Sequence, residues 1–289
     1  LEPINKIACS GDTVLFITTA TGTGVTYQWR KGNTNLIDGL IFSGVNNDTL
    51  IIISATISDT AFIYNVIASG ACNLKDTSIN ASLLINTAPI ITADPTNQTA
   101  CIGDSIQMIV KANGTGLNYQ WRKGNINLIN GLKYSGVNSD TLKISSFVFA
   151  DTSSIFNVIV SGTCFPNDTS INASLMNNSG PIITNEPSNI IACFGDSVSF
   201  NTVATGTGLT YQWRKGNVNL VNGLKYNGAN SNSLRINSIT ALDTATNYNV
   251  IVSGTCTPGD TSIFATLSTN EAPIITLEPN NQVACAGDS

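Results

Sequence analysis

The sequence predicts an all-β chain of tandem antiparallel sandwiches, and three observations carry this prediction. The heptapeptide YQWRKGN occurs at 27–33, 119–125 and 211–217, so the same segment returns every 92 residues. Cysteine returns with the same step in two separate series. Each period contains short segments in which polar and apolar residues alternate, which is the pattern of half-buried strands. A period of this length indicates an array of folded modules, each with a core of its own.

The period also places the module boundaries. We expect repeat 1 over 1–88, repeat 2 over 89–180 and repeat 3 over 181–272. Residues 273–289 match the opening of the other repeats and are expected to start a fourth. The 289 residues are therefore expected to belong to a longer array.

The third repeat illustrates the strand pattern. Tyr248, Val250 and Val252 share one face of a strand that lies within 241–252. Short strands at regular spacing, without helical periodicity, predict an antiparallel sandwich. The other expected strands lie at 197–202, 211–214, 233–236 and 263–267, the last with Ile263, Ala265 and Leu267 alternating with polar residues.

Composition excludes several classes of protein. Hydrophobic residues make up 42% of the chain, which is enough to build cores, and only 11% of the residues are charged. The 13 basic residues are spread along the chain, so no patch for nucleic acid or an anionic membrane is expected. Apolar runs such as 50–53 are far shorter than the roughly 18 residues of a membrane-spanning helix. We therefore expect no nucleic-acid partner and no membrane insertion.

The residue types that carry out catalysis are scarce. The absence of histidine rules out Ser-His-Asp and Cys-His arrangements and weakens any zinc site. The acidic residues are few and mostly belong to the turn motifs GDS and NDT. Asp94, Glu186 and Glu278 recur near the boundaries, but one carboxylate at each is too few for a calcium site of about 6–8 oxygens. We predict that the chain is not an enzyme and holds no cofactor and no metal.

The strand sequences resemble those of immunoglobulin-like (Ig-like) domains. In repeat 3, GDSV, YQWRK, SLRI and DTATNYNV are similar to strands B, C, E and F of that family. The recurring pattern PIITxxPxN, CxGDS, TGTGLxYQW and SGTC is similar to tandem Ig-like repeats in secreted proteins of Bacteroidota. The resemblance covers every repeat, and it implies the fold far more than any activity.

This resemblance implies a set of core residues. Phe156 stands at the tyrosine corner of repeat 2, so the hydroxyl-to-backbone bond of that corner should be absent there. The usual disulfide between strands B and F is also missing, because Val66, Val158 and Val250 stand where strand F would carry cysteine. Phe16, Met108 and Phe200 are expected to face these valines. The implied core comprises Trp29, Trp121 and Trp213 of strand C with Tyr64, Phe156 and Tyr248 of the corner.

The heptapeptide repeats because the module repeats. Trp29 and Tyr27 are expected in the core. The remaining side chains are expected to be exposed, and they could form a contact surface or simply reflect recent duplication. They are Gln28, Arg30, Lys31 and Asn33.

The cysteines need a different explanation from the family's usual disulfide. Periodic single cysteines in a charge-poor β protein indicate structural disulfides and an oxidising, extracytoplasmic compartment. In the implied topology Cys9 lies at the A–B turn, whereas Cys72 lies beyond strand F at the opposite end, roughly 25 Å away. A disulfide requires Cα atoms within about 7 Å, so a bond between these two would be strained.

End-to-end stacking would bring the A–B turn of one module to the F–G loop of the next. We therefore expect the pairs Cys9–Cys164 and Cys101–Cys256. Cys72, Cys193 and Cys285 would be left for partners outside this stretch of chain. Pairing within a repeat (Cys9 with Cys72), bonds between chains and free thiols remain alternatives.

Four Asp-Thr or Asp-Ser pairs match an O-glycosylation signature associated with Bacteroidota. An aliphatic residue or alanine follows each pair, although the same pairs also suit turns. The candidate acceptors are Thr13, Thr60, Ser105 and Thr244.

These features favour a non-catalytic structural array, forming an extracellular stalk, a filament or part of a cell-surface adhesin. Its expected partners are neighbouring repeats of the same chain and other copies in a filament. Two alternatives remain open. The exposed loops, such as 39–48, could bind a glycan or a protein, or the array could be a spacer in a large secreted enzyme.

Overall fold

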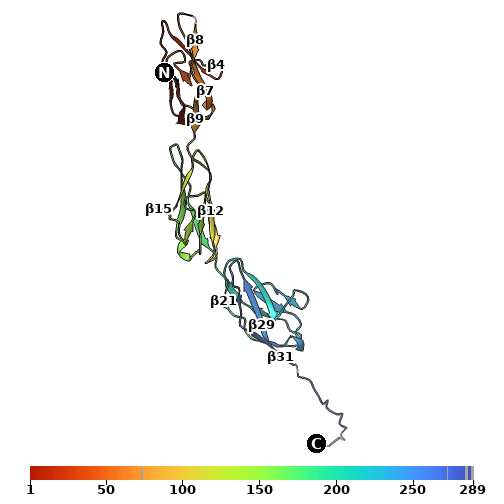
Figure 1. Ribbon diagram of the computed structural model, residues 1–289. Helices are drawn as coiled ribbons and strands as arrows, with labels where there is room; N and C mark the ends of the chain where they lie inside the picture. Colours follow the sequence, from red (N-terminus) through yellow and green to blue (C-terminus); the bar gives the residue numbers. More distant parts are fainter. Residues whose placement is uncertain (73, 272, 284–285, 288–289) are drawn as a thin grey trace. The chain divides into compact units, whose positions relative to one another are not determined.

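The structure, a computed structural model, describes residues 1–72, 74–271, 273–283 and 286–287. The chain divides into two compact units, Leu1–Met176 and Asn177–Ser289. Figure 1 shows sheets in both units, and the described residues contain strands and three short 3-10 helices but no α-helix. None of the described segments is a helix of the length and apolarity that a membrane crossing needs.

Two sandwiches make up the first unit. In the first of them, a six-stranded sheet has the order β1-β9-β7-β3-β4, with β8 also paired to β7, and the second sheet has the order β2-β6-β5. The elements are β1 (Lys6–Cys9), β2 (Val14–Ile17), β3 (Thr26–Lys31), β4 (Thr34–Asn35), β5 (Phe42–Ser43), β6 (Thr49–Ile52), η1 (Ile57–Asp59), β7 (Ala61–Ser69), β8 (Lys75–Thr77) and β9 (Ala81–Asn86).

The second sandwich repeats this plan and adds a short two-stranded sheet, β10-β13. Its larger sheets have the orders β11-β20-β18-β14-β15, with β19 on β18, and β12-β17-β16. The elements are β10 (Ile90–Ala93), β11 (Gln98–Ala100), β12 (Ile106–Ile109), β13 (Lys111–Asn113), β14 (Asn118–Lys123), β15 (Ile126–Asn127), β16 (Tyr134–Ser135), β17 (Thr141–Ile144), η2 (Phe149–Asp151), β18 (Ile155–Ser161), β19 (Asp168–Thr169) and β20 (Ala173–Asn177).

The second unit contains one further sandwich of the same kind. Its sheets are β21-β24, β22-β31-β29-β25-β26 with β30 on β29, and β23-β28-β27. The elements are β21 (Ile182–Asn185), β22 (Ile190–Cys193), β23 (Val198–Asn201), β24 (Val203–Thr205), β25 (Thr210–Lys215), β26 (Val218–Asn219), β27 (Tyr226–Asn227), β28 (Ser233–Ile236), η3 (Ala241–Asp243), β29 (Ala245–Ser253), β30 (Asp260–Thr261) and β31 (Ala265–Asn270).

Each core forms between the two large sheets of a sandwich. The tryptophan of β3, β14 or β25 is fully buried, and its indole N–H donates to a backbone carbonyl at 2.9 Å. The expected facing pairs of phenylalanine or methionine with valine lie in the same three cores. Apolar packing thus occupies the position of the usual disulfide between strands B and F. The buried residues at the centre include Trp29, Trp121, Trp213, Tyr64, Phe156 and Tyr248.

Five side chains differ in burial from what the sequence suggests, although Tyr27 still packs against the core. Tyr27 is only half-buried at the edge of the core, where its hydroxyl accepts the Ala20 N–H at 3.2 Å. Gln28, Arg30 and Lys31 are half-buried rather than exposed, and the Gln28 amide donates to two backbone carbonyls. Ile263 is exposed because β31 begins two residues later, at Ala265.

Candidate functional site at the joint of the first two sandwiches

Cys9 ends β1 and opens a tight turn. Its backbone N–H donates to the Asp12 carboxylate at 2.8 Å, and the Asp12 N–H donates back to the Cys9 carbonyl at 3.0 Å. Gly11, in the same turn, has φ +95°, a conformation that favours glycine. Cys101 and Cys193 begin equivalent turns. Asp12, Asp104 and Asp196 therefore each hold a turn that presents a cysteine.

Cys164 lies in the loop after β18 and is buried. The neighbouring Thr163 N–H donates to the Thr115 carbonyl at 2.8 Å, which ties this loop to the one before β14. A disulfide joins Cys164 to Cys9, with Cα atoms 5.8 Å apart and a sequence separation of 155. The sequence argument pairs the same two cysteines. Because Cys9 is bonded to Cys164, the alternative pairing of Cys9 with Cys72 does not occur in the structure. This bond links the first sandwich covalently to the second.

The other cysteines fall into three groups. Cys101 and Cys256 are each disulfide-bonded, and the Cys256 sulfur lies 3.2 Å from the Asn178 carbonyl oxygen. Their pairing with one another stays a prediction. Cys72 and Cys193 are exposed and carry no disulfide within the described residues. Cys285 lies outside the described residues.

The linker between β9 and β10 packs on the second sandwich and is hydrogen-bonded to it. Thr87 and Thr115 exchange two hydrogen bonds, since the Thr115 N–H donates to the Thr87 carbonyl and the Thr87 N–H donates to the Thr115 hydroxyl, both at 3.1 Å. Pro89 is buried above Gly114, where an added Cβ would lie 2.9 Å from the Pro89 Cα. The Ile91 N–H donates to the Asp168 carboxylate at 2.7 Å. Backbone and side chain together hold this linker in place.

The second unit contains the same linker contacts, with a proline packed over a loop glycine. Ser179 and Thr207 make the equivalent contacts, and an added Cβ at Gly206 would lie 2.9 Å from the Pro181 Cα. The Ile183 N–H donates to a carboxylate oxygen of Asp260 at 2.8 Å. Sequence reasoning missed these linker contacts. Their signal is the GTG motif at 22–24, 114–116 and 206–208, whose first glycine allows proline to approach the backbone in the second and third sandwiches.

The corner before strand F differs between sandwiches. The Tyr64 hydroxyl donates to the Asp59 carbonyl at 2.7 Å, and Tyr248 makes the same bond to Asp243. Burial, with a smaller contribution from Asp59, raises the pKa of Tyr64 well above its ordinary value. Phe156 has no hydroxyl to make such a bond, as the sequence predicts.

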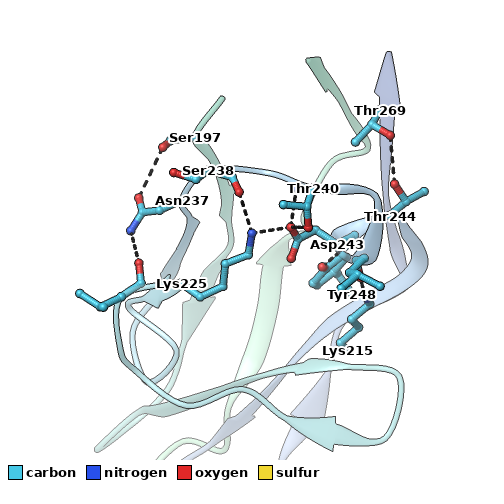
Figure 2. A network of polar contacts seen from close by, with 12 residues as sticks. Ser197, Lys215, Lys225, Asn237, Ser238, Thr240, Asp243, Thr244, Tyr248 and Thr269 are labelled. Carbon is cyan, nitrogen blue, oxygen red and sulfur yellow. Dashed lines mark hydrogen bonds and ion pairs between the residues drawn. The ribbon is translucent and has the colours of Figure 1, made fainter. Parts of the chain in front are cut away.

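A buried aspartate at the same corner accepts hydrogen bonds from its own turn. Lys133 forms an ion pair of 2.7 Å with Asp151, and Lys225 contacts Asp243, as Figure 2 shows for the second unit. Burial alone would raise the pKa of Asp243, but hydrogen bonds from Lys225 and Thr240 outweigh it and hold that pKa below its ordinary value. The first sandwich has Ile41 at the lysine position. These pairs stabilise the corner.

The carboxylates near the predicted module boundaries accept hydrogen bonds within their own sandwiches. Asp94 accepts the Ile171 N–H at 2.9 Å and Glu186 accepts the Ile263 N–H at 3.1 Å, so both hold the segment before a last strand. Glu278 is exposed. Within the part of the chain that the structure describes, histidine, cysteine and acidic side chains form no cluster of three or more that could hold a metal ion.

The candidate glycosylation sites differ in accessibility. Thr13, Ser105 and Thr244 are exposed. Thr60 is half-buried, and its hydroxyl accepts the Ile85 N–H at 3.3 Å. Modification stays a prediction for all four, and the geometry favours the three exposed positions.

Comparison with solved structures identifies the architecture. The three-domain fragment I67–I69 of titin matches with a TM-score of 0.55 and 18% identity, over 93% of this chain and 97% of that one. The modules are immunoglobulin-like β-sandwiches in tandem. Immunoglobulin domains 1–5 of Sidekick-1 match with a TM-score of 0.52 and 20% identity, over 94% of this chain and 58% of that one.

A viral protein shares this arrangement too. The three N-terminal domains of the highly immunogenic outer capsid protein of bacteriophage RB49 match with a TM-score of 0.55 and 15% identity, over 91% and 96% of the two chains. No protein-family model and no curated protein sequence matches the chain. At these identities the likeness establishes the fold alone.

Proposed function

We propose that this chain is a non-catalytic, load-bearing part of an extracellular stalk or filament. The observation that carries the proposal is the Cys9–Cys164 disulfide, which covalently joins two neighbouring modules. Each module already has a complete core of its own, so the bond is not needed to close a sandwich. The disulfide instead constrains the connection between the two modules.

Covalent connection changes how the chain carries tension. A load applied to the two ends passes from Cys9 directly to Cys164, so the residues between them lie outside the load path. The bond closes a loop of 155 residues. For a loop of that length the chain-entropy model gives a stabilisation on the order of 5 kcal/mol. The linker contacts at Pro89 and Thr87 add a non-covalent hold on the same joint.

Two further features support an extracellular structural role. Disulfides persist in oxidising compartments, and four cysteines of this chain are disulfide-bonded. The buried aspartates accept backbone N–H groups of their own corners, and Asp151 and Asp243 also contact lysines, so their carboxylates are already engaged in holding the fold. The proposed partners are neighbouring modules of the same kind.

Single-molecule stretching tests this proposal. The chain is held by its ends and extended in oxidising buffer, then again after reduction. The 155-residue separation of Cys9 and Cys164 corresponds to roughly 500 Å of extended chain. We expect the reduced chain to reach a contour length at least that much greater than the oxidised chain. Cys72→Ser, which leaves the joint intact, is the control. Equal contour lengths before and after reduction would contradict a load-bearing bond.

A further inference from the structure

The outer face of the β2-β6-β5 sheet in the first sandwich is apolar. Side chains alternate along β2 and β6, so that Phe16 enters the core while Leu15 and Ile51 point away from it. Leu15 and Ile51 are cross-strand partners, and the Ile53 N–H donates to the Ile41 carbonyl, just before β5, at 2.8 Å. The outward aliphatic residues, named the apolar face below, are Leu15, Ile17, Ile41, Ile51 and Ile53.

The apolar face is open to solvent. Four of its side chains are between 41% and 49% exposed. Ile51 is half-buried at its centre, between its partners Leu15 on β2 and Ser43 on β5. The second sandwich is equally open at this face, since Ile109, the equivalent of Ile17, is 52% exposed. Aliphatic side chains gathered on an exposed surface are typical of an interaction site.

The two other sandwiches have polar residues at all but one of these positions. Lys143 and Arg235, both exposed, stand at the position of Ile51. The heptapeptide YQWRKGN is identical in all three repeats, whereas this face differs, so duplication does not account for it. The remaining equivalents are Gln107, Ile109, Lys133 and Ser145 in the second sandwich and Ser199, Asn201, Lys225 and Asn237 in the third.

Charge indicates which surface the apolar face fits. Packed against the equivalent face of the second or third sandwich, it would bury the cation of Lys143 or Arg235 without a partner, which is unfavourable. Either of those faces packed on its own copy would bring like charges together. Among the three outer sheet faces, the apolar face is therefore the one that can pack on a second copy of itself without burying an unpaired charge.

The size of the apolar face also favours a second copy. Five partly exposed aliphatic side chains offer an area on the order of a few hundred Å². A stable complex of two proteins buries roughly 800 Å² of each partner, so this face alone is too small to hold a separate protein firmly. Weak contacts of this size suit filaments that lie side by side, because several such contacts act together.

We propose that the apolar face is a lateral contact between two copies of this chain, in which the β2-β6-β5 sheets of their first sandwiches pack face to face about a two-fold axis. A two-fold contact places the same residues opposite one another. Ile51, at the centre of the face, would then meet Ile51 of the second copy. This proposal rests on the filament role proposed above and names the surface through which two filaments meet.

Sedimentation of the whole chain tests this contact. Free thiols are first alkylated, so that chance disulfides cannot link two copies while the Cys9–Cys164 bond is kept. We expect a reversible monomer–dimer equilibrium that depends on concentration in analytical ultracentrifugation. Ile51→Lys should weaken the dimer at least about tenfold, because it brings two unpaired ammonium groups together. Lys143 occupies the same strand position in the second sandwich, so the variant should fold.

Leu132→Lys is the matched control. It makes the same change at a fully exposed loop position of the second sandwich, away from the apolar face, and should leave the dimer unchanged. A chain that stays monomeric at every concentration would overturn the proposal. Dimers that the two lysine variants weaken equally would overturn it too, because the apolar face would then have no special part in the contact.

A charge-swap pair tests the two-fold symmetry. Ile51→Lys and Ile51→Glu chains should each be monomeric at concentrations where the parent dimerises. Mixing them should restore dimers, since the same position meets itself across the axis and the two charges then attract. Mixed chains that stay monomeric would overturn the two-fold packing.

The result is separable from the test of the load-bearing disulfide. Stretching is carried out on single chains, so equal contour lengths there would contradict the proposed load path whether or not copies associate. Monomers in the ultracentrifuge would overturn the lateral contact and leave the Cys9–Cys164 bond as it is.

Discussion

The backbone N–H of Ser154 donates a hydrogen bond of 3.2 Å to the carbonyl oxygen of Asp151. In the other two sandwiches a tyrosine hydroxyl donates to the equivalent carbonyl. Thr152 adopts a helical conformation that brings Ser154 into place, whereas the equivalent Thr60 has φ −54° and ψ 124°, outside the helical region. Strand F consequently begins at Ile155, two positions later in its repeat than β7 or β29. In the second sandwich a backbone N–H thus satisfies the Asp151 carbonyl, which has no tyrosine hydroxyl to bond it.

Removing the corner tyrosine from the first sandwich should therefore lower the free energy of unfolding by more than adding a tyrosine to the second sandwich raises it. Tyr64→Phe leaves the buried Asp59 carbonyl without its donor, so we expect the free energy of unfolding to fall by about 1–2 kcal/mol. Phe156→Tyr should give no gain, because Ser154 already occupies the acceptor. Urea unfolding of both variants beside the parent chain checks this. A clear stabilisation by Phe156→Tyr would show that the corner can adopt the tyrosine geometry freely.

The tryptophan of the second sandwich should dominate its core. Trp121 is fully buried, and its indole N–H donates to the Ser139 carbonyl at 2.9 Å. Trp121→Ala should lower the stability of this sandwich by about 3–5 kcal/mol, the usual range for a buried aromatic residue. Leu132→Ala, at a fully exposed loop position, is the control and should have little effect. A loss below about 1 kcal/mol for the tryptophan variant would contradict its central position in the core.

Stability should depend on pH through the ion pair at the corner of the second unit. The folded pKa of Asp243 lies below its ordinary value, so the pair contributes fully above the unfolded pKa of about 3.9 and less as pH falls through the lower folded value. Lys225→Met should destabilise the unit at pH 7, and the difference from the parent should shrink as pH falls below the unfolded pKa of Asp243 and through the lower folded one. Urea unfolding at several pH values measures it. A difference that does not change with pH would exclude the ionic contribution.

Much of the fold could be predicted because the period repeats the same local pattern. β28 (Ser233–Ile236) has the predicted bounds, and the three tryptophans and the corner residues are buried as expected. These features depend on alternation within one strand. The exposure of Ile263 could not be predicted, because it depends on where β31 begins.

Features that depend on contacts between distant segments were less predictable. Lys133 reaches Asp151 across 18 positions, and no local pattern marks that pair. The packing of Pro89 over Gly114 requires two loops and a linker to meet, so the spacing of residues along the sequence did not indicate it. The Cys9–Cys164 pair is different, since the topology that the Ig-like resemblance implies, together with the reach of an extended strand, favours it over a bond within one repeat.

Disulfide mapping of the native chain tests the central claim most directly. After thiols are blocked, proteolysis without reduction and mass spectrometry identify every linked peptide. We expect Cys9 joined to Cys164 and Cys101 joined to Cys256, so that the bonds connect neighbouring modules. Peptides joining Cys9 to Cys72, or Cys101 to Cys164, would place the bonds within modules and contradict the account.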